Sequence, residues 1–218
     1  MNNREFIVRR IAQEFKDGDV VNLGVGMPTM AVNYIPDNVH IMLQAENGIL
    51  GVGPKATKEQ ENIDCIDSGG SYVTTIAGAC YFDSALSFSI IRGGHVDITV
   101  LGALEVDENG NLASWMIPGK KVPGMGGAMD LVVGAKRVIV AMDHVNKDGE
   151  PKILEHCKLP LTAVNVVQTI VTEMAVIDVI PGTGLMLKEI APGLSVEDVQ
   201  KATRAKLLIS PNLKAIAV

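Results

Sequence analysis

Residues 44–53 read "QAENGILGVG" and directly follow the apolar run "VHIML" at residues 39–43. The run is short, apolar and followed by turn residues, which predicts a buried strand. Glu46 and Asn47 then lie at or just past its carboxyl end, where open α/β sheets form their binding crevices. Taken alone, Asn-Gly is more simply a polar turn, because it is a common turn dipeptide. The meaning of Glu46 therefore depends on the rest of the chain.

Strand and helix patterns alternate along the sequence. Helices are predicted over residues 4–16, after Pro28, from Asp83 or Ser84 to Gly93, over "GAMDLVVGA" (127–135) and over "SVEDVQKAT" (195–203). Strands are predicted at "VVNLG" (20–24) and "RVIVAM" (137–142). This alternation predicts an α/β fold, an open mostly parallel sheet with helices on both faces.

Two longer segments are harder to divide. Residues 96–115 predict a long strand, an Asn-Gly turn and a returning strand. Residues 161–180 mix the helical and strand periods, and we expect a helix leading into a strand there.

Composition limits the classes of function. A length of 218 residues with 47% hydrophobic content fits a single domain over residues 1–218. A net charge of −6 with scattered Lys and Arg argues against nucleic acid as a partner. Cys65, Cys80 and Cys157 lack disulfide or zinc spacing and are expected to be buried thiols. The polar N-terminus and the lack of a long apolar run predict a cytoplasmic protein with no membrane span.

Two glycine clusters precede predicted helices. Gly24 and Gly26 lie in "LGVGMP", and Gly124, Gly126 and Gly127 lie in "GMGGAMD". Such clusters let backbone N–H groups converge on an anion or on an oxyanion formed during reaction, although each is equally compatible with a tight turn. The four histidines show no metal-ligand spacing, and no metal is predicted. His144 follows a predicted strand but is more simply a hydrogen-bonded loop residue.

"LQAENGILG" (residues 43–51) resembles the active-site pattern of the 3-oxoacid-type CoA transferases at every position except Ala45, where that family usually has serine. The segments "VNLGVGMPT", "IRGGHVDITVLGALEVDENGN", "WMIPGKKVPGMGGAMDLV" and "KLPLTA" are similar to the beta, or B, subunit of the two-chain enzymes of acetate, butyrate and acetoacetate metabolism. The resemblance spans almost the whole chain. It implies the open α/β/α CoA-transferase fold and the family's nucleophile at Glu46.

The implied reaction explains the need for a carboxylate. Glu46 would attack an acyl-CoA to give an acyl-glutamyl anhydride and CoA thiolate, and the thiolate would then form a glutamyl-CoA thioester, with ping-pong kinetics. The anhydride must be kept from water. We expect oxyanion or CoA contacts from backbone amides near Gly126, Gly127 and Ala128, and at Asn47, Gly24 and Gly26. CoA and acyl-CoA are substrates, and no permanently bound cofactor is implied.

The resemblance also predicts a partner and leaves several choices open. The glycine-rich signature of the alpha subunit is absent, which implies an alpha partner in a heterotetramer of two alpha and two beta chains. Ala45 removes a hydroxyl that would support the orientation of Glu46. Lys120, Lys121, Lys136 and Arg137 are candidates for CoA phosphates or simply solvated residues. The other interpretations are a sugar-phosphate isomerase with Glu46 as general base and a non-catalytic binding subunit.

Overall fold

The computed structural model describes residues 1–120, 122 and 124–218. The helical elements are α1 (Asn3–Ala12), the 3-10 helix η1 (Pro28–Tyr34), α2 (Ser84–Arg92), α3 (Ala128–Gly134) and α4 (Val196–Lys201). The strands are β1 (Val20–Leu23), β2 (Met42–Ala45), β3 (Ile49–Lys55), β4 (Val73–Tyr81), β5 (Ile98–Leu101), β6 (Glu105–Asp107), β7 (Leu112–Ala113), β8 (Arg137–Ala141), β9 (Ile153–Leu154), β10 (Thr169–Val171), β11 (Ala175–Ile180), β12 (Gly184–Ile190) and β13 (Leu207–Ala215).

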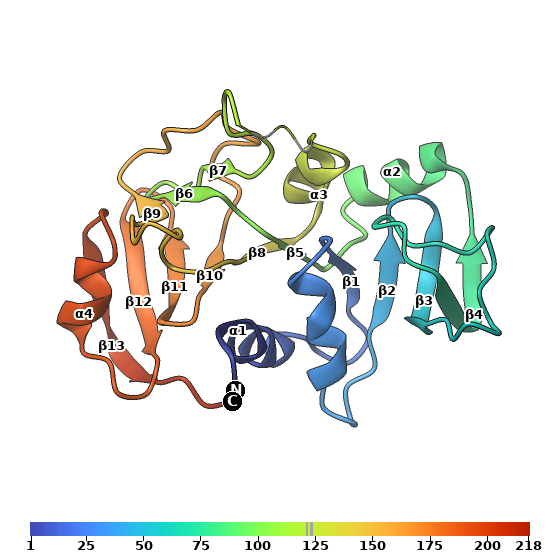
Figure 1. Cartoon of the computed structure of the whole chain (residues 1–218), viewed down its shortest axis with the longest axis horizontal. Helices are drawn as coiled ribbons and strands as arrows, with labels where there is room; N and C mark the ends of the chain where they lie inside the picture. The colour runs from blue at the N-terminus through green and yellow to red at the C-terminus, as the bar shows by residue number, and fades with distance from the viewer. Residues whose placement is uncertain (121, 123) are drawn as a thin grey trace.

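A ten-stranded sheet runs through the molecule in the order β13-β12-β11-β10-β8-β5-β1-β2-β3-β4 (Figure 1). Its centre, from β10 through β8, β5 and β1 to β2, is parallel. Antiparallel strands extend it at both ends, and only the outer pair β12 and β13 is again parallel. The predicted mostly parallel α/β sheet is therefore confirmed. Parallel strands direct their carboxyl ends to one edge, where a binding site is expected.

Helices cover both faces of the central strands. On β8, Ile139 and Ala141 pack with α1 and η1, whereas Val138 and Val140 pack with α3, α4 and the small sheet β7-β6-β9. Figure 1 shows α1 and η1 on one side of the sheet and α2 and α3 on the other. The strands at the centre are buried on both faces, as β5 illustrates, because a sheet covered on both sides needs near-continuous apolar strands.

Local signals fix most helix starts. The Asp83 side chain accepts a hydrogen bond from Leu86 N and caps α2. Ser195 and Asp198 form a capping box at α4. Pro28 begins η1, so the predicted helix there is present as a 3-10 helix.

Two sequence predictions were wrong. The long strand expected over residues 96–115 divides at Gly102, because the chain leaves the main sheet after β5 and enters a second sheet as β6. The helix expected at the start of residues 161–180 is instead a loop followed by β10. The strand expected after that helix is present as β11. β10 is buried on both faces and therefore lacks the alternation that would identify it as a strand.

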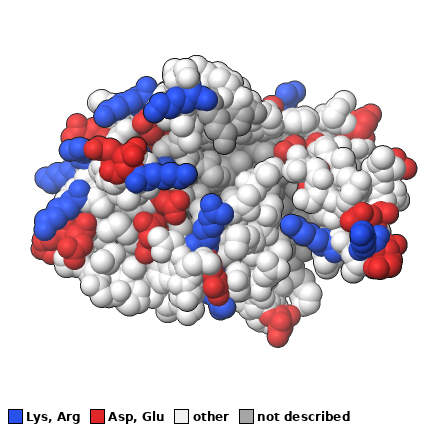
Figure 2. Space-filling view, in the orientation of Figure 1, with Lys and Arg blue, Asp and Glu red and all other residues white. Residues whose placement is uncertain are grey.

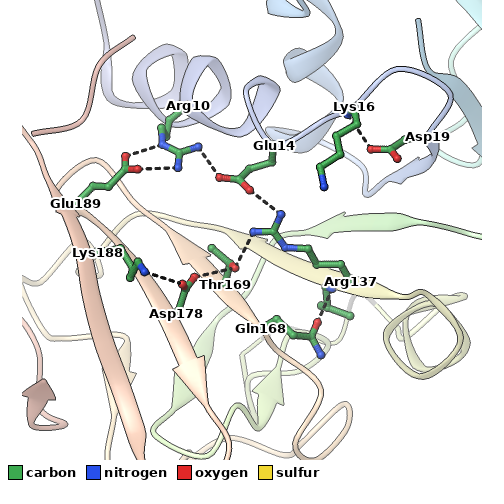
Figure 3. Close-up of polar contacts among 11 residues, drawn as sticks. Arg10, Glu14, Lys16, Asp19, Arg137, Gln168, Thr169, Asp178, Lys188 and Glu189 are labelled. Carbon is green, nitrogen blue, oxygen red and sulfur yellow. Dashed lines mark hydrogen bonds and ion pairs between the residues drawn. The ribbon is translucent and has the colours of Figure 1, made fainter. Parts of the chain in front are cut away.

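A buried ion-pair network joins α1 to the sheet (Figure 3). Arg10 donates from Nε and Nη2 to the two carboxylate oxygens of Glu189 on β12, at 2.7 and 2.9 Å. Its Nη1 donates to Glu14 at 2.6 Å, and Glu14 also pairs with Arg137 at 2.6 Å.

On the face of the molecule drawn in Figure 2, Lys and Arg are interspersed with Asp and Glu.

Candidate active site

Glu46 lies in the tight turn between β2 and β3, at the carboxyl edge of the parallel strands. Gly48 closes this turn, with its N–H donating to Ala45 O and its carbonyl accepting from Phe82 N, both at 3.0 Å. Its φ is +124°, and a Cβ there would lie 2.0 Å from Phe82 O. Glycine is therefore required at this position. The turn leaves the Glu46 side chain half-buried.

The Asn22 side chain is hydrogen-bonded to the Glu46 carboxylate. Asn22 lies within β1, is 1% exposed, and donates from Nδ2 to Glu46 Oε2 at 3.1 Å. The same Nδ2 faces Gln44 O at 3.1 Å and Gln44 Oε1 at 2.8 Å. Three acceptors around one amide group fix its orientation, because an amide oxygen in that place would face a backbone carbonyl and a carboxylate.

The contacts continue from Gln44 into helix α2. Gln44 is 3% exposed, and its Nε2 donates to Ser87 Oγ at 3.0 Å. Ser87 is fully buried on α2. We call Ser87, Gln44 and Asn22 the amide relay. It connects the interior of α2 to the carboxylate of Glu46 through hydrogen bonds between buried groups.

The oxygen of the Asn22 amide, Oδ1, has no hydrogen-bond partner within the part of the chain that the structure describes. Within the described residues, Asn22 Oδ1 and Thr99 Oγ1 are the buried side-chain atoms that lack a hydrogen bond. An unsatisfied buried acceptor costs about 1–3 kcal/mol. Such a cost in a native protein calls for an explanation, and functional sites are one place where it is found.

Gly127 packs closely against the Glu46 side chain. A Cβ at residue 127 would lie 3.1 Å from Glu46 Cγ and 3.3 Å from Phe88 Cζ. Its φ of −83° is open to any residue, so the requirement here is for space and not for backbone freedom. Glu46 is thus confined between Asn22 and the start of α3.

The predicted backbone donors differ in availability. The N–H of Ala128 donates to Met125 O at 3.1 Å, and that of Gly24 donates to Val100 O at 2.8 Å, so neither is free to meet a ligand. Within the described residues, the N–H groups of Gly126 and Gly127 donate to no protein acceptor. Of the three amides expected near α3, two therefore remain as candidate donors.

A crevice runs along the carboxyl ends of β1, β5 and β8 and reaches Ala128, the residue that follows Gly127. Its first part has a volume of about 380 Å³ and is lined by Gly24, Val25, Leu101, Gly102, Ala103, Leu104, Ser114, Gly124, Met125 and Ala128. Its second part, about 240 Å³, shares Val25, Gly102 and Ala103 with the first. It adds Gly26, Arg4 and Lys152 among its lining residues. Burial lowers the pKa of Lys152, while Asp143 and Glu173 oppose that shift.

Asn47 and Ala45, the neighbours of Glu46 in the chain, make their contacts away from its carboxylate. Asn47 is exposed, and its Nδ2 donates to Ile66 O at 2.8 Å. The Ala45 side chain packs with Ile49, Cys65 and Val73 in a small apolar cluster. A hydroxyl at residue 45 would point into that cluster and away from the relay, because adjacent residues of a strand face opposite sides.

Lys136 and Arg137, two of the basic residues that the sequence offered for CoA phosphates, do not line the crevice. Lys136 pairs with Asp97 at 2.6 Å, and Arg137 pairs with Glu14, both at the amino end of β8, opposite to the crevice. Lys120 is exposed in a loop, and Lys121 lies outside the described residues. The basic residues that line the crevice are Arg4 and Lys152. Their proximity could not be predicted from the sequence, because they are far apart in the chain.

The remaining reactive side chains are not part of this site. His144 is fully buried, and its ring nitrogens contact Thr172 Oγ1 at 2.9 Å and Thr203 Oγ1 at 2.8 Å. It lies in a loop and is hydrogen-bonded, as expected, and its burial lowers its pKa to about 4. All three cysteines are free, but Cys80 is exposed and Cys157 half-buried, contrary to the expectation of buried thiols.

The sequence of this chain is similar to those of known coenzyme A transferases. The sequence model of the coenzyme A transferase family matches residues 4–202. The B subunit of a probable succinyl-CoA:3-ketoacid coenzyme A transferase of Bacillus subtilis is 52% identical over 210 residues, 96% of this chain and 97% of the relative. The beta subunit of the acetate CoA-transferase of Escherichia coli K12 is 51% identical over 213 residues, 98% of this chain and 97% of the relative.

A solved structure has the same fold. The acyl-CoA transferase YdiF of Escherichia coli O157:H7, in a thioester complex with CoA, superposes with a TM-score of 0.73 at 25% identity. The match covers all of this chain (100%) and 43% of YdiF, so the chain spans less than half of that enzyme. The chain belongs to the coenzyme A transferase family, and the predicted enzyme class, a CoA-transferase, is confirmed. The two close relatives are named as subunits of their enzymes.

In the described part of the chain, none of the helices combines the length and the hydropathy that a membrane span needs.

Proposed function

We propose that this chain is the catalytic beta subunit of a short-chain acyl-CoA:carboxylate CoA-transferase with Glu46 as its nucleophile. The observation that carries the proposal is the position of Glu46, which lies between Asn22 and Gly127 at the carboxyl edge of the sheet, where the crevice reaches Ala128. The names of the relatives, acetate and succinyl-CoA:3-ketoacid transferases, give the class of substrate.

The chemistry proceeds through two covalent states of Glu46. A carboxylate oxygen attacks the thioester carbonyl of the acyl-CoA and expels CoA thiolate, which leaves an acyl-glutamyl anhydride. The thiolate then attacks the glutamyl carbonyl and expels the carboxylate product, leaving a glutamyl-CoA thioester. An incoming acid reverses both steps. The thioester complex of YdiF supports the second state.

The crevice suits an extended CoA chain. Gly24 and Gly102 form a part of the wall that has no side chains, and Gly127 provides an N–H group beside Glu46, with that of Gly126 one residue before it. Arg4 and Lys152 supply positive charge in the far part of the crevice, where the phosphates of CoA would be neutralised. Half-burial of Glu46 is consistent with a site that a second polypeptide closes against water.

An alpha subunit is the proposed partner. The subunit names of the relatives and the coverage of only 43% of YdiF support a second polypeptide of comparable size. A heterotetramer of two alpha and two beta chains is the assembly we expect. Native mass spectrometry of the co-expressed chains measures this stoichiometry directly.

The test is a covalent adduct on Glu46. The assembled complex is incubated with acetoacetyl-CoA, and the peptide that contains Glu46 is examined by mass spectrometry for glutamyl-CoA, or for a hydroxamate after hydroxylamine treatment. Glu46→Gln should abolish both the adduct and turnover, because an amide does not attack the thioester. Glu197→Gln, an exposed carboxylate on α4, is the matched control and should behave as wild type.

Each alternative predicts a different result. Substantial turnover in Glu46→Gln would place the nucleophile elsewhere and refute the proposal. Wild-type complex that binds acyl-CoA but forms no adduct would favour the non-catalytic subunit. Isomerisation of a sugar phosphate without an adduct would favour Glu46 as a general base.

A further inference from the structure

We infer that Asn22 is a catalytic residue that stabilises the oxyanion formed on the carboxyl group of Glu46 itself, and that Gln44 and Ser87 are its positioning residues. The inference rests on the proposed function, because it assigns a donor to the second covalent step. It concerns the oxygen of the enzyme's own carboxylate and not the oxygen of the substrate's acyl group.

The geometry distinguishes the two oxygens of Glu46. Oε2 accepts from Asn22 Nδ2 at 3.1 Å, whereas Oε1 accepts no hydrogen bond from the described residues. The oxygen with the free lone pairs, Oε1, is the one that attacks the acyl-CoA and becomes the bridging oxygen of the anhydride. Oε2 keeps its carbonyl character and stays against Asn22.

The second step then develops charge at Oε2. CoA thiolate forms a bond to the glutamyl carbon, and the carbonyl electron pair moves onto Oε2, which becomes an oxyanion. Collapse of this intermediate restores the carbonyl and breaks the bond to the bridging oxygen, which leaves with the acyl group as a carboxylate. The same oxyanion forms when the incoming acid attacks the glutamyl-CoA thioester. Asn22 Nδ2 is the side-chain donor already directed at that atom.

The hydrogen-bond count explains how the contact strengthens at this moment. Asn22 Nδ2 has two hydrogens and faces three acceptors, which are Gln44 O, Gln44 Oε1 and Glu46 Oε2. One hydrogen is therefore shared. In the anhydride it is divided between two neutral carbonyl oxygens, and in the tetrahedral intermediate the charged oxygen attracts it more strongly. A contact that is stronger in the transition state than in the ground state accelerates the step.

The amide relay keeps Asn22 in place through hydrogen bonds between buried side chains. Gln44 Oε1 accepts from Asn22, and Gln44 Nε2 donates to Ser87 Oγ, with all three side chains buried. Asn22 Oδ1 has no partner among the described residues. An amide that served only to complete the hydrogen bonds of the core would have partners for both of its polar atoms. Preorganised donors of this kind avoid reorganisation during the reaction.

The test measures how fast the assembled complex forms glutamyl-CoA in a single turnover after mixing with acetoacetyl-CoA and quenching with acid. Asn22→Ala should slow this rate by about 100-fold, the loss typical of one oxyanion donor. Asn22→Asp keeps the shape of the side chain and serves where alanine impairs folding. Its carboxylate repels Glu46 at pH 7, so adduct formation should also be slow. As the pH falls, a proton shared by the two carboxyls restores one O–H donor, and the rate should rise towards wild type.

Two further variants separate catalysis from structure. Thr99→Val removes the other unpaired buried side-chain atom, from the residue beside Asn22 on β5, and should leave the rate unchanged. Ser87→Ala should lower the single-turnover rate several-fold with little change in KM, because it frees Gln44 to move. Glu46→Gln without adduct, together with wild-type rates in both Asn22 variants, would refute this inference and leave the proposed function intact. Glu46→Gln with adduct would refute the proposed function itself.

Discussion

Glu189→Gln tests how strongly the network in Figure 3 holds α1 to the sheet. The side chains of Arg10 and Glu189 are only 10% and 6% exposed, and they form two parallel hydrogen bonds. Glutamine has almost the same shape as glutamate but no charge. The substitution therefore leaves the Arg10 guanidinium buried with Glu14 as its remaining carboxylate partner.

The expected loss is at the low end of the range for a broken buried ion pair. Removal of one partner from such a pair costs about 3–5 kcal/mol. Since Glu14 still compensates Arg10, we expect a decrease of about 3 kcal/mol in the free energy of unfolding at pH 7. For a chain of this length, that corresponds to a fall of roughly 6–12 °C in Tm.

The loss should depend on pH in a defined direction. Burial opposes ionisation of both carboxyls, but Arg10 and Lys214 beside Glu189, and Arg137 and Arg10 beside Glu14, more than compensate, so the pKa of each carboxyl lies below its usual value. The stabilisation by each is complete above the unfolded pKa, near ~4.3, and is lost as the pH falls through the folded pKa. The difference between wild type and Glu189→Gln should therefore be constant from pH 7 to 5 and decrease below ~4.3.

Urea unfolding followed by circular dichroism, from pH 7 to 3.5, measures this difference. Glu5→Gln is the matched control, because Glu5 pairs with Arg9 on the same helix at a side-chain exposure of 28% and 41%. It should cost at most ~0.5 kcal/mol. If Glu189→Gln costs no more than Glu5→Gln, or if its cost increases on acidification, the network does not stabilise the fold as argued.

Gly127→Ala should lower kcat about tenfold while the free energy of unfolding falls by less than ~1.5 kcal/mol, because the new methyl group displaces Glu46 by a few tenths of an ångström; unchanged turnover in the assembled complex would show that the Glu46 position is not critical. His144, neutral in the fold with a pKa of about 4, should make wild-type stability fall by roughly 3 kcal/mol from pH 6.5 to 4, since the unfolded chain binds the proton first. His144→Gln should abolish this slope in urea titrations between pH 6.5 and 4.5, and persistence of the slope would assign it to other groups.

The centre of the sheet could be predicted from the sequence, but its margins could not. β1 and β8 are apolar runs of the kind that parallel strands require, and both were predicted. No strand was predicted at β4 or β13, which form the two edges. β13 contains Pro211, which argues against a central strand and is tolerated at an edge. β4 is mostly exposed and carries Gly78 with a φ of +86°.

Glu46, the proposed nucleophile, was singled out from the sequence, whereas Asn22, which is hydrogen-bonded to it, was not. Glu46 was predicted from the resemblance of residues 43–51 to the active-site pattern of the family and from its place after a predicted strand. Asn22 carried a local signal, an amide within the apolar strand "VVNL", since a buried amide needs a partner. The identity of that partner depends on the pairing of β1 with β2, which no spacing within one chain specifies. The sequence therefore directed attention to Asn47, the neighbour in the chain, in place of Asn22, the neighbour in space.

The register of β1 and β2 explains why these two residues meet. The parallel pairing sets Val20 beside Met42 and Asn22 beside Gln44. Side chains alternate along a strand, so Gln44 faces the relay, Ala45 faces the apolar cluster, and Glu46 returns to the side of Asn22. A shift of one residue would direct Ala45 towards Ser87 and Glu46 into the cluster of Ile49, Cys65 and Val73. Burial of that cluster therefore fixes the face on which Glu46, the proposed nucleophile, lies, and core packing and the position of the carboxylate depend on one register.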